Sequence, residues 1–69
     1  MTPERPYYYR MCMIASDING FLLRGGDPIE YIRDHEYTQG FWQELKEWMR
    51  RNAPGQYANI PLRRRLVFH

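Results

Sequence analysis

The feature that most constrains this chain is an apolar stripe at helical spacing within the segment TQGFWQELKEWMRRNAPG, residues 38–55. Five apolar residues recur there at intervals of one, three or four positions, which places them on one side of a helix. They are Phe41, Trp42, Leu45, Trp48 and Met49. Thr38 is placed to cap the first turn, and the Pro-Gly pair at 54–55 predicts the end of the helix. In a chain of 69 residues, whose core is thin, we expect this stripe to be core rather than a binding groove.

A second, shorter helix is predicted over residues 28–36. Asp27 is a favourable N-cap, and Pro28 fits the first helical position. Asp27, Glu30 and Asp34 follow one another at helical intervals, so they share one face. That face is acidic and lies opposite the isoleucines of the same segment.

The remaining segments favour strands. Residues 7–16 alternate in a way that places apolar side chains on both faces, and tyrosine favours extended structure. Asn-Gly at 19–20 predicts a hairpin turn, followed by a short strand over 21–24. The alternation of leucine and arginine in 62–68 predicts a third strand.

Together these segments predict an α+β fold in which an antiparallel sheet of about three strands packs against two helices. No repeat or linker divides the chain, so we expect residues 1–69 to form a single domain, and a monomer. Aromatic residues make up 16% of the sequence, which disfavours disorder and gives a small core much apolar area.

One cysteine, Cys12, excludes an intrachain disulfide and favours a reducing compartment. The N-terminus has no apolar run of the signal-peptide type, and no stretch approaches the length of a membrane span. We expect a soluble cytoplasmic protein, complete from its first methionine.

No motif in the sequence predicts catalysis or a cofactor. Cys12, His35 and His69 are too few and too scattered for a zinc site. Gly25-Gly26 precedes a helix, but Asp27 is set to occupy the N–H groups that would bind a phosphate, so we interpret the pair as a flexible turn. Small nuclease toxins combine arginine, histidine and tyrosine in a short chain, but no spacing here ties such residues together. We therefore expect neither an enzyme nor a cofactor nor a bound metal.

The charges are sorted along the chain. The net charge is +2, but residues 17–47 hold seven acids and three bases, whereas residues 48–69 hold five arginines and no acid. Such asymmetry bears on partners rather than on fold.

The acids provide the first candidate site. Regularly spaced carboxylates can imitate phosphates and occupy the basic nucleic-acid channel of another protein, although a solvated helix face is the commoner role. The acids spaced in this way are Asp27, Glu30 and Asp34 on one predicted helix and Glu44 and Glu47 on the other.

The arginines provide the alternative site. A small nucleic-acid-binding or regulatory protein would contact phosphates with the C-terminal bases. These are Arg50, Arg51, Arg63, Arg64 and Arg65.

The chain as a whole resembles the small anti-CRISPR proteins encoded by phages and mobile elements. The resemblance extends over the full length and lies in size, aromatic content and clustered acids such as DPIEYIRDHE at 27–36. Among these proteins, the chain is most similar to those that act on type I CRISPR systems, including subtype I-C. The resemblance implies a non-enzymatic inhibitor in the host bacterial cytoplasm that binds a Cas subunit of the surveillance complex and blocks the binding of target DNA. Carried onto this sequence, it implies the candidate partner-binding acids Asp27, Glu30, Asp34, Glu36, Glu44 and Glu47. The positive net charge departs from this pattern and leaves open whether the acids or the arginines make the contact.

Overall fold

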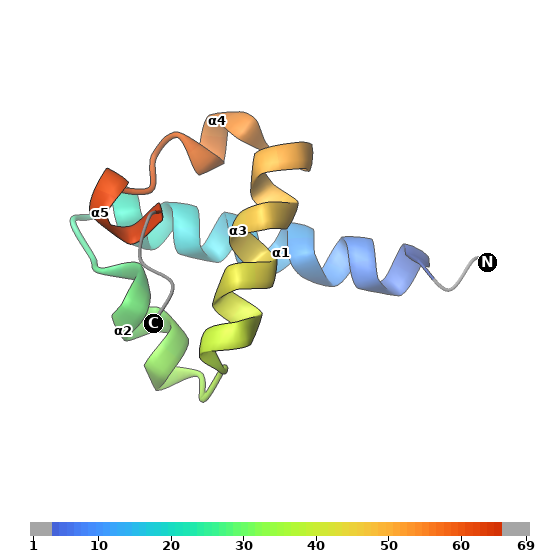
Figure 1. Cartoon of the computed structure of the whole chain (residues 1–69), viewed down its shortest axis with the longest axis horizontal. Coiled ribbons are helices and arrows are strands. Elements are labelled where there is room, and N and C mark those ends of the chain that lie inside the picture. Colours follow the sequence, from blue (N-terminus) through green and yellow to red (C-terminus); the bar gives the residue numbers. More distant parts are fainter. Residues whose placement is uncertain (1–3, 66–69) are drawn as a thin grey trace.

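The computed structural model describes residues 4–65, and this range contains five helices and no strand (Figure 1). The helices are α1 (Glu4–Leu23), α2 (Pro28–Asp34), α3 (Gln39–Asn52), α4 (Pro54–Tyr57) and α5 (Leu62–Arg65). The prediction of an α+β fold with a three-stranded sheet is therefore wrong. The described part of the chain is a small all-helical protein.

The first two predicted strands, 7–16 and 21–24, and the hairpin turn at 19–20 all lie inside the single helix α1, apart from Arg24, which directly follows it. The alternation in 7–16 is real, but it is shorter than a second pattern that runs through the same residues. Met11, Ile14 and Ile18 recur at three and four positions and are at most 4% exposed. A strand would place Met11 on the opposite face from Ile14 and Ile18, whereas a helix buries all three on one face.

Two glycines end α1 by a Schellman motif. Gly25 has a φ of +85°, the left-handed conformation that glycine adopts without steric cost. The N–H of Gly26 donates to the carbonyl of Phe21 at 2.8 Å, and that of Gly25 donates to Leu22 at 3.0 Å. The glycine pair is thus a helix stop rather than a flexible turn, and it directs the chain into α2.

The two predicted helices are confirmed, together with their caps. Asp27 Oδ1 accepts a hydrogen bond from the N–H of Ile29 at 3.0 Å, and Thr38 Oγ1 accepts one from Phe41 at 2.9 Å. The helix predicted to end before Pro54 does so, but Pro54 then opens α4. Shortly after α2 comes Glu36, which is the one non-glycine residue of the described chain with positive φ, at 58°.

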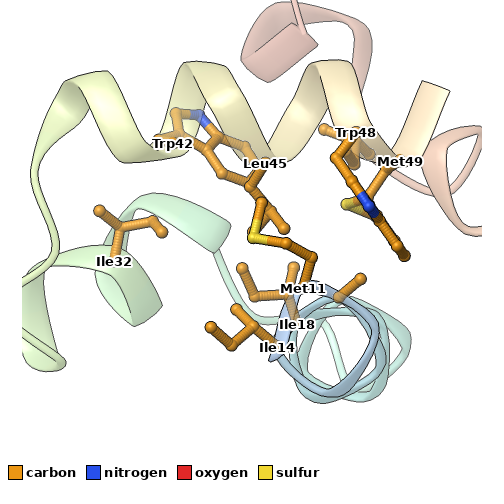
Figure 2. Close-up of a cluster of buried hydrophobic side chains, with 10 residues drawn as sticks. Met11, Ile14, Ile18, Ile32, Trp42, Leu45, Trp48 and Met49 are labelled. Atoms are coloured by element: carbon orange, nitrogen blue, oxygen red, sulfur yellow. The ribbon is translucent and has the colours of Figure 1, made fainter. Parts of the chain in front are cut away.

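The core lies between α1 and α3, and α2 closes one side of it (Figure 2). Figure 2 shows Met11 of α1 pointing toward Leu45 of α3, and Ile14 and Ile18 belong to the same cluster. The apolar stripe of α3 is buried as expected, with Trp42 at 2% and Leu45 at 0% exposure. Ile60, which follows α4, completes this cluster. Burial of one such side chain stabilises the fold by about 1.5–3 kcal/mol, so this cluster is the main source of stability.

The prediction of a third strand over 62–68 is also wrong for those of its residues that the structure describes. Residues 62–65 form α5, and 66–68 lie outside the described residues. Lys46 fixes α5 against α3, because its Nζ donates to the carbonyls of Arg64 at 3.2 Å and Arg65 at 3.4 Å. Lys46 is only 4% exposed, and this burial lowers the pKa of its amine.

Within residues 4–65, no helix combines the length and the apolar character that crossing a bilayer requires.

Candidate functional site

Three of the predicted acids lie on the outward side of α2 and just after it. Ile32 turns inward and is buried, so Glu30 and Asp34, one turn apart, face solvent. Glu36 follows the helix and is exposed as well. We call these three residues and Asp17 the α2 acidic surface.

Asp17 belongs to this surface although it lies on α1. The Tyr31 hydroxyl of α2 lies 3.5 Å from Asp17 Oδ2, at the outer limit of a hydrogen bond. Burial, together with the nearby negative charge of Asp17, raises the pKa of Tyr31 to about 12. Sequence reasoning did not select Asp17, because only the packing of α1 against α2 brings it beside Tyr31.

A row of aromatic rings runs beside the α2 acidic surface. Tyr31 and His35 stack with their centroids 4.0 Å apart, and Tyr37 stacks on His35 at 5.7 Å. Phe21 packs on Tyr31 at one end of the row, and Phe41 on Tyr37 at the other. His35 Nδ1 lies 2.9 Å from the carbonyl oxygen of Tyr31. The row joins three helices into one surface and was not predicted, although Tyr31 and His35 stand four residues apart in the sequence.

Asp27, the first of the predicted acids, is not available to a partner. Arg64 of α5 holds its carboxylate in a two-pronged ion pair, with Nε 3.0 Å from Oδ1. Burial raises the pKa of Asp27, but hydrogen bonds from Arg64 and from the N–H of Ile29 outweigh it and hold this pKa below its ordinary value.

The two acids of α3 lie in a different environment. Glu44 accepts a hydrogen bond from the hydroxyl of Tyr7, and this bond raises the pKa of the phenol. Glu47 forms ion pairs with both Arg50 and Arg51. The hydrogen bond from Arg50 holds the pKa of Glu47 below its ordinary value. The six predicted acids therefore do not form one surface.

The five predicted arginines are divided as well. Arg50 and Arg51 lie at the end of α3, whereas the other three lie on α5, which Figure 1 shows at a different edge of the molecule. Arg64 turns toward Asp27, and Arg65 donates from Nε to the carbonyl of Ile60 at 2.9 Å. Arg63 is exposed, whereas Arg64 and Arg65 are half-buried.

A pocket of about 340 Å³ opens between α2 and α3. Ile29, Ile32 and Trp42 form its apolar wall, and Arg33 and Arg64 lie at its rim. Trp42 Nε1 is buried and has no hydrogen-bond partner among the described residues. Among the described residues that line the pocket there is no carboxylate, histidine or cysteine. Tyr37 supplies the one phenol among these lining residues.

Over the described range, no three acidic, histidine or cysteine side chains lie close enough together to hold a metal ion. Cys12 is exposed on α1. Comparison of the chain with protein family models, with curated proteins and with solved structures finds no match. Its function is therefore argued from its own surface.

Proposed function

We propose that this protein is a non-enzymatic inhibitor that binds a basic, DNA-reading surface of another protein through its α2 acidic surface. The resemblance to anti-CRISPR proteins implies that the partner is a type I CRISPR surveillance complex, for example one of subtype I-C. The contact acids are then Glu30, Asp34 and Glu36, with Asp17 added and with Asp27, Glu44 and Glu47 left out.

The observation that carries the proposal is the distribution of paired and exposed charge. Internal ion pairs engage Arg64 with Asp27, and Arg50 and Arg51 with Glu47. Glu30, Asp34 and Glu36 are exposed, with Arg33 as the one base of α2. This distribution favours the acids over the arginines as the contact surface.

The size of the surface indicates what kind of contact to expect. Residues four apart on a helix are separated by about 6 Å of rise, whereas duplex DNA carries one charge per ~1.7 Å of its axis. Glu30 and Asp34 are therefore too sparse to imitate a long duplex. We expect them to neutralise a few lysines or arginines, with the neighbouring aromatic row supplying apolar contact area.

The test is competition for target DNA. A purified type I-C surveillance complex is incubated with labelled target duplex, and DNA binding is measured as the protein is added. We expect wild-type protein to displace the DNA, and Glu30→Lys with Asp34→Lys to weaken inhibition about 100-fold, since reversed charges meet cations. Far-UV circular dichroism verifies that the double variant stays helical.

The matched control is Glu44→Lys, which reverses an exposed acid on α3. We expect it to inhibit as the wild type does. Full inhibition by the Glu30→Lys, Asp34→Lys variant would refute the α2 acidic surface as the contact. Direct salt-sensitive binding of the protein to duplex DNA, lost in Arg63→Glu, would instead favour the arginine alternative.

A further inference from the structure

α1 carries a second apolar face on the side away from the core. A helix at a protein surface normally presents charged and polar residues there. This face has no charged residue, and its members are spaced alternately four and three apart. They are Tyr9, Met13, Ser16, Gly20 and Leu23. Tyr9 is 60%, Met13 62% and Leu23 69% exposed, so no described helix of this chain covers them.

Gly20 is a second, independent indication that another chain contacts this face. Glycine inside a helix destabilises it relative to alanine, because its backbone loses more freedom on folding. A Cβ built at Gly20 meets nothing within 4 Å, so packing within the described part of the chain does not require a glycine here. A glycine on an exposed helix face allows a second backbone to approach closely.

We propose that this face binds the same face of a second copy of the chain, with the two α1 helices antiparallel about a two-fold axis. In a pair of packed helices, the contact residues are spaced alternately four and three positions apart, which keeps them all on the side that faces the partner helix. The proposal departs from the monomer that we expected from the sequence.

The sizes of the side chains fit an antiparallel pair. The large residues, Tyr9 and Met13, lie in the N-terminal half of α1, and the small ones, Ser16 and Gly20, in the C-terminal half. When Met13 lies opposite Ser16 of the second copy, Tyr9 lies opposite Gly20 of that copy. Each large side chain then fills the space over a small one, and the two-fold axis repeats both contacts.

The charges beside the face select the same alignment. Arg10 and Asp17 stand seven residues apart, so both lie along one flank of the face, and both are exposed. In the alignment described, Arg10 lies near Asp17 of the second copy, and this attraction also occurs twice. A shift by one repeat would place the two Asp17 side chains near each other, which is unfavourable.

The area of the face sets the expected strength. From Pro6 to Leu23 the helix is about 27 Å long and about 10 Å wide, which is smaller than the ~800 Å² per partner of a standard interface. We therefore expect a weak, reversible dimer with a dissociation constant in the micromolar range. The face shares only Asp17, on its flank, with the α2 acidic surface. Gly20→Leu changes none of the acids proposed for inhibition, so dimerisation and inhibition can fail independently.

The test is sedimentation velocity of the full chain over a wide concentration series. Wild type is expected to pass from monomer to dimer. Gly20→Leu should raise the melting temperature measured at low concentration and abolish the dimer. Gly55→Leu is the matched control, because a Cβ added at Gly55 also meets nothing within 4 Å, although this glycine lies on α4. It should leave the dimer unchanged.

The charge pair tests the alignment. Arg10→Asp and Asp17→Arg should each raise the dissociation constant about tenfold, and the double swap should restore it. A wild-type chain that stays monomeric throughout, or a Gly20→Leu variant that dimerises normally, would overturn the proposal. A monomer that instead binds lipid vesicles through Tyr9 and Met13 would overturn it in favour of a membrane surface.

Discussion

Arg64 and Asp27, 37 residues apart in the sequence, form a two-pronged ion pair that fastens α5 to the start of α2. The same Asp27 carboxylate caps α2 by accepting a hydrogen bond from the N–H of Ile29. One side chain thus stabilises a helix start and a tertiary contact at once. The ion pair also joins one acid and one base that the sequence offered as candidate contacts.

The first prediction is that Asp27 and Arg64 are energetically coupled. Both side chains are less than a third exposed, at 28% and 26%. Asp27→Asn keeps a capping side chain and loses the ion pair, and Arg64→Ala loses the ion pair from the other side. We expect each to lower the free energy of unfolding by about 1 kcal/mol, and the double variant to lower it by little more than either single one.

Urea denaturation of the four proteins in this cycle provides the measurement. Asp27→Ala should cost about 1 kcal/mol more than Asp27→Asn, because it also removes the cap. Strictly additive losses for Asp27→Asn and Arg64→Ala would show that the ion pair contributes nothing to stability.

The second prediction concerns acid. The pKa of Asp27 in the folded protein lies below its ordinary value. Its contribution to stability is therefore fully present above the unfolded pKa of about 3.9, and is lost as the pH falls through the folded pKa. We expect the urea midpoint of wild type to fall more steeply below about pH 4 than that of Asp27→Asn. Parallel curves for the two proteins would contradict this assignment.

The third prediction concerns the link between α1 and α2 at the α2 acidic surface. Tyr31 should ionise near its pKa of about 12, later than an exposed tyrosine. Burial is the larger cause and the charge of Asp17 the next, so Asp17→Asn should lower this pKa only in part. Ultraviolet titration of the phenolates measures it, and Tyr31→Phe identifies the signal. An unchanged titration in Asp17→Asn would show that the two side chains do not meet in solution.

The sequence predicted α2 and α3 because the signals for both are local. Asp27 and Thr38 cap the helices that directly follow them, and the apolar stripe of α3 can be recognised from the residues of that helix alone. α1 was predicted as two strands because Tyr7, Tyr9 and the methionines alternate, and because apolar residues occur all round the segment. Gly25 was the local signal that a long helix ends there, but it was interpreted as a turn.

The candidate site was predicted in part. The exposure of Glu30 and Asp34 follows from their spacing on α2, opposite Ile32. The neighbouring Asp17 and the aromatic row did not follow, because three helices supply them and only packing brings them together. We predicted that the arginine run lies in a strand. In the structure it lies on α5, where Arg64 pairs with Asp27 and Arg65 donates to the carbonyl of Ile60.

What the sequence by itself determined are the starts of α2 and α3, the apolar stripe of α3 and the separation of acids from arginines along the chain, since each depends on neighbours within a few residues. Only the tertiary structure decided which charges remain exposed. Lys46, a charged residue within α3, is buried because the carbonyls of Arg64 and Arg65 come within reach of its amine. The carboxylate of Asp27 is paired within the chain because Arg64 lies beside it. A charge is accessible or paired according to what the folded chain places next to it, and that neighbour can be far away in sequence.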